Sequence, residues 1–334
     1  MTANDTRPLV VLDADGVFMN EMTYWRTALA AAFTLAGIAI KDTATWKRLD
    51  RACLQRSRLQ RITKSRACNS NWDLAAVMAA ALADESTRTE VQRHLVEGAD
   101  DAVAAALGAG MERLWSKPDP DGPPISGFGI DRKGAEFAAA RTRFQEILYL
   151  QRDIGWSYPR HELLPPAEKT RAALARMRDA GLALTVCTSR QRDETETPIR
   201  TLELAEYFDV DRMATHDEAR RAQQETGIAP LGKPHWFPLV AAVLGYSAAV
   251  DAVQRDAKQL AVDGCGPVVY VGDASADFDT VRGAHARGLP VTYVHIDSGV
   301  SMAATLDAVR AAPVTAGIVP DLAAAADLIL ERLL

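Results

Sequence analysis

LVVLDADGV, residues 9–17, begins with a continuous apolar run and ends in two aspartates and a glycine. A short apolar run without alternation is typical of a strand that is buried on both faces, as in a parallel sheet covered by helices. Ligands bind such open sheets beyond the carboxyl ends of their strands. The stretch therefore predicts a central parallel strand, Leu9–Leu12, that carries Asp13 and Asp15 at the functional edge of the sheet.

Three more apolar runs of this kind follow much later in the chain, at residues 182–187, 268–271 and 290–295. Helical stretches precede or follow them, at residues 165–181, 277–287 and 321–334. Strands that alternate with helices indicate a doubly wound parallel sheet. The predicted fold class is therefore α/β, with a Rossmann-like core.

The sequence between Gly16 and about residue 167 has a different character, because alanine- and leucine-rich helical stretches dominate it. They lie at residues 21–36, 71–83, 90–115 and 135–151. No convincing strand pattern interrupts them. We therefore expect a mostly α-helical cap domain, residues 18–167, inserted after the first strand of an α/β core formed by residues 1–17 and 168–334.

The composition is that of an ordinary globular protein, since 48% of the 334 residues are hydrophobic and 25% are charged. A net charge of −6 and 6% aromatic residues argue against a nucleic-acid partner. The longest weakly polar stretch, about residues 28–40, is too short to span a bilayer. The four cysteines stand far apart, and the first residues carry no secretion signal. We expect a cytoplasmic monomer or homodimer that binds no membrane.

Two carboxylates at a strand end can divide the work of a group transfer. One of Asp13 and Asp15 could attack a phosphorus atom or bind metal, while the other exchanges a proton with the leaving group. An ordinary strand-end turn explains the same residues equally well, because Asp and Gly are common in turns. This motif alone leaves both readings open.

Three further signals follow along the chain. Thr188 and Ser189, at the end of another predicted strand, could bond phosphoryl oxygens. Lys233 could neutralise the charge of a phosphoryl group, and Asp273 and Asp277 could approach a hard cation. Taken singly, they also fit a helix cap, a surface lysine and an acidic helix start. Their joint occurrence, three of the four signals at predicted strand ends, favours one site.

These motifs resemble those of the haloacid dehalogenase superfamily of phosphatases: an Asp-x-Asp-Gly strand end, a strand-end Thr or Ser, a later Lys, and a Gly-Asp-x-x-x-Asp strand end. The helical insert is placed like the C1 cap of this superfamily, as in phosphoglycolate phosphatases. The resemblance implies covalent phosphoryl transfer with Asp13 as nucleophile and Asp15 as acid and base. It places Thr188 and Lys233 at the phosphoryl group, and leaves the role of the residues next to Thr188 uncertain.

The resemblance also implies a Mg²⁺ cofactor. Asp13, the backbone carbonyl of Asp15 and Asp273 would hold it, with Asp277 as a further ligand or as support. Asp15 bears on the reaction class, because family members that cleave carbon–halogen bonds lack this acid. The implied activity is Mg²⁺-dependent hydrolysis of a small phosphorylated metabolite.

Three alternatives stay open at this stage. A phosphomutase of the β-phosphoglucomutase type would share every core residue named above. A carbon–phosphorus hydrolase would need a cap lysine that forms a Schiff base. A non-catalytic phosphate-sensing or scaffold protein is disfavoured, because it has no need of both Asp13 and Asp15.

A polar turn of the cap is the best candidate for contacts to the leaving group of a substrate. Its residues Arg66, Asn69, Asn71 and Asp73 could reach a polar substrate. In the alternative reading, Asn71 caps a helix that begins at Trp72, and Trp72 packs in the core of the cap.

Overall fold

The computed structural model describes residues 7–40, 42–54, 59, 62, 70–115, 124–150, 152–156, 158, 161–164, 166–299, 301 and 303–333. The chain divides into two compact units. We call the one that combines Met1–Asn20 with His161–Leu334 the α/β core, and Glu21–Arg160 the helical unit. The sequence placed these boundaries at residues 17/18 and 167/168.

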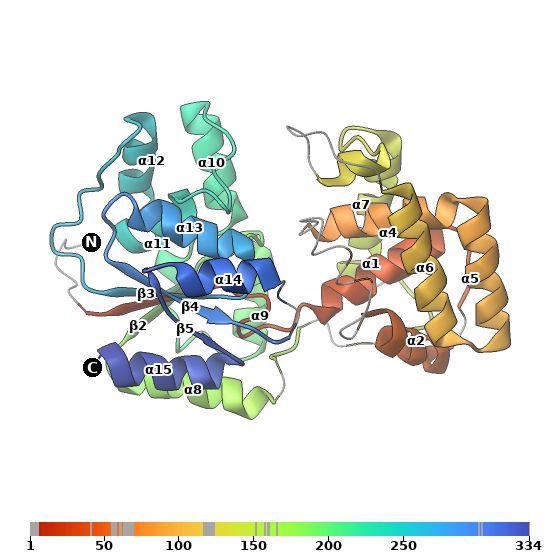
Figure 1. Ribbon diagram of the computed structural model, residues 1–334, viewed down its shortest axis with the longest axis horizontal. Coiled ribbons are helices and arrows are strands. Elements are labelled where there is room, and N and C mark those ends of the chain that lie inside the picture. The colour runs from red at the N-terminus through yellow and green to blue at the C-terminus, as the bar shows by residue number, and fades with distance from the viewer. Residues whose placement is uncertain are drawn as a thin grey trace. The chain divides into compact units, whose positions relative to one another are not determined.

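The core is built on a five-stranded parallel sheet with the order β2-β1-β3-β4-β5 (Figure 1). The strands are β1 (Leu9–Leu12), β2 (Ala183–Val186), β3 (Val268–Gly272), β4 (Val291–Ile296) and β5 (Thr315–Val319). Strand β1 is central, since Leu9 pairs with Ala183 on one side and with Val268 on the other. The predicted α/β class with a parallel sheet is confirmed.

Helices cover both faces of this sheet. They are α8 (Ala167–Asp179), α9 (Arg192–Thr201), α10 (His216–Thr226), α11 (Phe237–Leu244), α12 (Tyr246–Gln254), α13 (Ser275–His285), α14 (Ala303–Ala311) and α15 (Leu322–Leu333), with a short 3₁₀ helix, η3, at Val210–Arg212. Leu9 and Val11 pack in one buried cluster with α10–α14, while Val10 and Leu12 pack in another with α8, α9 and α15. Figure 1 shows α8 and α15 on the face opposite α11, α13 and α14. The apolar run of β1 is continuous because both of its faces are buried.

The helical unit folds around a hydrophobic cluster of its own. Its elements are α1 (Met22–Leu35), α2 (Thr43–Leu49), a π-helical turn η1 (Asp50–Leu54), α4 (Asn71–Ala83), α5 (Glu85–Glu97), α6 (Asp100–Leu114), a 3₁₀ helix η2 (Pro124–Phe128) and α7 (Ala135–Leu148). Among the described residues of the whole chain, no helix is both long and apolar enough to cross a membrane.

The elements differ from the sequence-based interpretation in three places. The single helix expected over residues 90–115 is two helices, because Gly98 takes the left-handed conformation (φ 70°) that ends α5. Strand β5 was not anticipated, since it is half-buried and contains Gly317. Helix α4 begins at Asn71 and is capped by Ser70, whose hydroxyl accepts a hydrogen bond from the backbone N–H of Asp73. The alternative reading, in which Asn71 caps a helix that begins at Trp72, is therefore wrong.

Candidate active site

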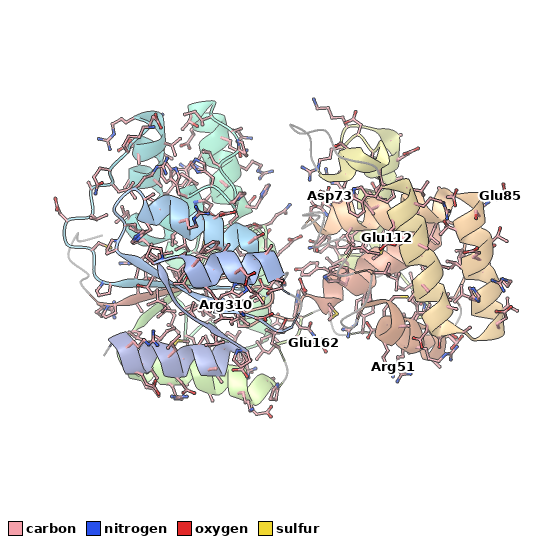
Figure 2. The ribbon with its side chains drawn as sticks, in the orientation of Figure 1. Arg51, Asp73, Glu85, Glu112, Glu162 and Arg310 are labelled. Atoms are coloured by element: carbon pink, nitrogen blue, oxygen red, sulfur yellow. The ribbon has the colours of Figure 1, made fainter. Side chains whose placement is uncertain are left out.

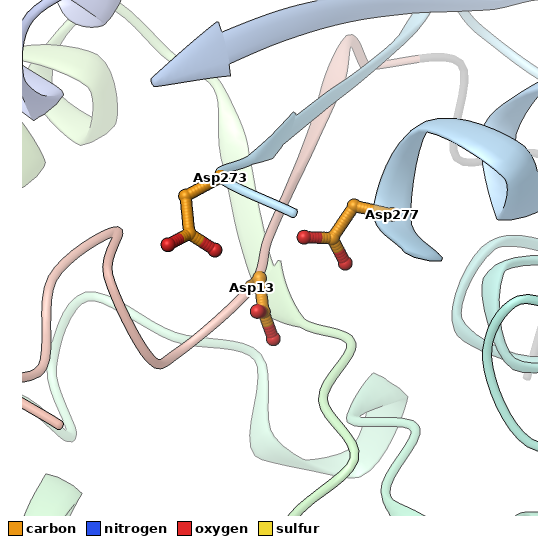
Figure 3. A group of neighbouring side chains, drawn as sticks. All are labelled: Asp13, Asp273 and Asp277. Carbon is orange, nitrogen blue, oxygen red and sulfur yellow. The ribbon is translucent and has the colours of Figure 1, made fainter. Parts of the chain in front are cut away.

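Three carboxylates from separate elements converge at the carboxyl edge of the sheet. Asp13 directly follows β1, Asp273 directly follows β3, and Asp277 lies in the first turn of α13. One oxygen of each lies within 4.8 Å of one oxygen of both others, and Figure 3 shows the three groups together. The convergence follows from the topology, because β1 and β3 are hydrogen-bonded neighbours and their ends meet at the same edge.

Two glycines let the backbone approach these carboxylates closely. Gly16 has a φ of 74°, and a Cβ there would overlap the carboxylate of Asp273. A Cβ at Gly272 would lie 2.6 Å from both Cβ and Oδ2 of Asp277. At both positions, a residue with a Cβ would therefore clash with a carboxylate of the site.

Lys233 binds two of the three carboxylates. Its Nζ lies 2.9 Å from Asp13 Oδ1 and donates to Asp277 Oδ1 at 2.6 Å, and its side chain is only 4% exposed. Burial lowers the pKa of this ammonium, but the charges of Asp13 and Asp277 raise it by more, and the net shift is upward. Lys233 is therefore a fixed cation, which Asp13 and Asp277 share.

Burial is also the dominant influence on Asp13. It raises the pKa of this carboxyl to about 7, with Lys233 opposing the shift and Asp277 and Asp15 adding to it. Asp13 Oδ1 is buried and accepts no well-aligned hydrogen bond in the described structure, although the ammonium of Lys233 is close. Such an oxygen fits a further positive partner. A hard divalent cation with oxygen ligands meets that need.

Asp277 is already engaged by hydrogen-bond donors. Its Oδ1 accepts from Lys233 and from the buried hydroxyl of Tyr270 at 2.9 Å, and its Oδ2 accepts from the backbone N–H of Ala274 at 3.2 Å. Of the two roles considered for Asp277, this favours support of the site. Tyr270 had no role in the sequence-based prediction, and its only signal was a hydroxyl inside the apolar run of β3.

The second motif follows β2, the other neighbour of β1. Thr188 is 3% exposed, and its Oγ1 accepts from the backbone N–H of Arg190 at 3.3 Å, while Ser189 is exposed. Arg190 donates from Nε to Asp15 Oδ2 at 2.8 Å and from Nη2 to Asp15 Oδ1. The second motif thus reaches the first through Arg190, whose role the sequence left open.

The structure places the predicted substrate-binding residues of the cap in different environments, and two of them are not described. Asp73, labelled in Figure 2, is 1% exposed. Its Oδ1 accepts a hydrogen bond from Arg132 Nε at 3.1 Å, and its Oδ2 accepts one from Arg132 Nη2. Burial raises the pKa of Asp73, and Arg132 opposes the shift. Asn71 is half-buried at the start of α4, and Arg66 and Asn69 lie outside the described residues. The pair with Arg132 favours a structural role for Asp73, and contact of any of these residues with substrate stays a prediction.

Comparison with known proteins gives a likeness of fold. No family model matches the chain, and no curated protein matches it in sequence. An X-ray structure of a structural genomics target is similar over 98% of this chain and 99% of its own, at 18% identity and a TM-score of 0.68. At this identity the similarity establishes the fold alone.

Solved structures of haloacid dehalogenase superfamily hydrolases are also among the matches. One is a subfamily IA hydrolase from Geobacter sulfurreducens, at 14% identity and a TM-score of 0.40 over 98% of this chain and all of its own. A proposed phosphoglycolate phosphatase from Lactobacillus delbrueckii subsp. bulgaricus matches at 15% identity and a TM-score of 0.49, over 98% of each chain.

Proposed function

We propose that this protein is a Mg²⁺-dependent phosphomonoester hydrolase of the haloacid dehalogenase type, acting on a small phosphorylated metabolite. The observation that carries the proposal is the convergence of Asp13, Asp273 and Asp277, of which Asp13 and Asp277 bind the ammonium of Lys233. Three carboxylates and one ammonium leave a formal charge of −2, which a divalent cation neutralises. The four motifs that meet at this edge occur in the order typical of the superfamily.

Asp13 is the nucleophile in this proposal. Its carboxylate attacks phosphorus and forms an aspartyl-phosphate, while the bond from phosphorus to the leaving oxygen breaks. Lys233 favours the ionised form of Asp13 and offsets negative charge on the phosphoryl group. Thr188 Oγ1 accepts from Arg190 N–H, and its own proton can be donated to a phosphoryl oxygen. Asp13 and Asp273 would hold Mg²⁺, which when bound would supply further positive charge for the phosphoryl oxygens.

Asp15 moves the proton. It donates a proton to the leaving oxygen as the aspartyl-phosphate forms, which leaves Asp15 as a carboxylate. It then takes a proton from the water that attacks phosphorus. The phosphoryl group leaves Asp13 as inorganic phosphate, so both aspartates return to their starting states.

The test is phosphate release from p-nitrophenyl phosphate and from a panel of phosphorylated metabolites, with Mg²⁺ and with EDTA. We expect Mg²⁺-dependent release that falls by about 1,000-fold or more in Asp13→Asn, at an unchanged melting temperature. Undiminished turnover by that variant contradicts the role of Asp13. Transfer of phosphate between positions of a sugar identifies a phosphomutase, and absence of release across the panel favours a scaffold.

A further inference from the structure

We propose that Arg190 is a positioning residue for Asp15, whose carboxylate it orients for proton exchange with the leaving group. The inference rests on the proposed function, because it concerns the residue that we assign as acid and base. It adds a residue that none of the four superfamily motifs includes.

Arg190 is itself held firmly. Its side chain is 5% exposed, and Nη1 donates to the backbone carbonyl of Glu194 at 3.3 Å. Its backbone N–H donates to Thr188 Oγ1, and its carbonyl accepts from the backbone N–H of His216 at 2.8 Å. The guanidinium therefore has little freedom to move, and it can define the position of a more mobile group.

Asp15 is the more exposed partner of this pair. Its side chain is 27% exposed and leaves the strand end beside Gly16, whereas Arg190 is buried. Two parallel N–H donors on the two carboxylate oxygens fix both the rotation and the plane of the group, which a lysine cannot do with one ammonium. Each carboxylate oxygen keeps another lone pair. The bound carboxylate can therefore still meet a leaving oxygen.

A role in positioning Asp15 has a chemical signature that a role in stability lacks. An ester with a poor leaving group, such as an alkyl phosphate, depends on proton donation, whereas an aryl phosphate with an acidic phenol depends on it little. The value of kcat/KM reports the chemistry up to the departure of the leaving group. Loss of the orienting contact should therefore reduce kcat/KM for alkyl esters more than for aryl esters.

The experiment compares Arg190→Met with the wild type on p-nitrophenyl phosphate and on an alkyl phosphate that the wild type hydrolyses. We expect kcat/KM to fall about 100-fold on the alkyl ester and at most about fivefold on the aryl ester. Arg190→Lys, which keeps the charge but loses the two-point contact, should show the same selective loss. Arg192→Met is the matched control, because Arg192 is a nearby arginine, the first residue of α9, and pairs with Glu218 and Glu196. It should show no selective loss.

A double-mutant cycle completes the test. In an Asp15→Asn background, Arg190→Met should cause no further selective loss, because Arg190 acts through Asp15. Equal losses on both esters, or a further full loss in the Asp15→Asn background, overturn the positioning role while the proposed function stands. A well-folded wild type that releases no phosphate from any ester overturns the proposed function and the inference together.

Discussion

The two units bury carboxylates in different ways. In the helical unit, Asp73 and Asp50 each pair with their own arginine, Arg132 and Arg26, through two hydrogen bonds. In the α/β core, three carboxylates gather at one edge of the sheet, and two of them, Asp13 and Asp277, bind the same cation, Lys233. One-to-one pairing satisfies a buried charge and makes it part of the fold, whereas an excess of carboxylates needs a further cation. The excess of carboxylates over cations therefore belongs to the proposed site, whereas the one-to-one pairs belong to the fold.

The largest expected effect comes from reducing the excess charge. Asp273→Asn should lower Mg²⁺-dependent phosphate release by about 1,000-fold, because it removes a ligand of the proposed cation. It should also abolish the rise in melting temperature that Mg²⁺ causes in the wild type. Activity assays and thermal melts with and without Mg²⁺ measure both effects. A variant that Mg²⁺ still stabilises as strongly would show that Asp273 does not hold the cation.

Breaking a balanced pair should affect stability instead. Asp73→Asn removes the charge partner of Arg132, whose side chain is 48% exposed and can be solvated, and we expect the free energy of unfolding to fall by about 2 kcal/mol. Urea denaturation measures the loss, and Mg²⁺ dependence should be unchanged. Replacing both partners, Asp73→Leu with Arg132→Leu, should recover part of the stability. A change in substrate preference without loss of stability would instead support the predicted contact of Asp73 with substrate.

Glu194, in the core, also differs from the paired carboxylates of the helical unit. Its carboxylate has no arginine partner among the described residues. Burial raises its pKa to about 7, the backbone N–H of Gln191 opposes the shift, and Asp15 and Asp217 add to it. The folded state holds a proton that the unfolded state releases near pH 4.5, so this group lowers stability as the pH rises from about 4.5 to about 7.

Replacing Glu194 should therefore change the free energy of unfolding only at higher pH. Glu194→Gln should stabilise the protein by about 2 kcal/mol at pH 8 and leave its stability unchanged at pH 4. Urea denaturation at both values measures the difference. Glu196→Gln is the control on the same helix, because Glu196 pairs with Arg192 at 2.9 Å. A gain at pH 8 in the control but not in Glu194→Gln would contradict the assignment.

The smallest effect is expected at Tyr270. Tyr270→Phe removes the hydroxyl that donates to Asp277 and keeps the ring beside Lys233. Because Asp277 retains Lys233 and Ala274 N–H, the rate of phosphate release should fall only about tenfold. Steady-state kinetics measures this rate. An unchanged rate would show that Lys233 and the backbone N–H of Ala274 are sufficient to orient Asp277.

The sequence predicted the sheet and the acidic strand ends because both depend on local patterns. Buried strands such as β1 and β3 read as apolar runs, and Asp13 and Asp273 follow them directly. Strand β5 lacked this signal, because it lies at the edge of the sheet and is half-buried. Gly98 divides a helical stretch whose composition alone looked continuous.

The remaining contacts of the site depend on pairing between distant segments. Arg190 reaches Asp15 because β2 and β1 are neighbours in the sheet, an order that the sequence does not specify. Asp73 lies in a stretch that reads as a polar turn, yet its carboxylate is buried and pairs with Arg132, 59 positions away. Residues of one type, such as Asp15 and Asp73, therefore have different environments because their contacts with distant segments differ.

The most direct test of the account is to trap the phosphorylated enzyme. Wild-type protein mixed with Mg²⁺ and substrate, quenched in acid within the first turnover and digested, should carry one phosphoryl group on the peptide that contains Asp13, as measured by mass spectrometry. The same peptide from Asp13→Asn should carry none. Turnover without a phosphorylated peptide, or with the phosphoryl group on another residue, would contradict the account.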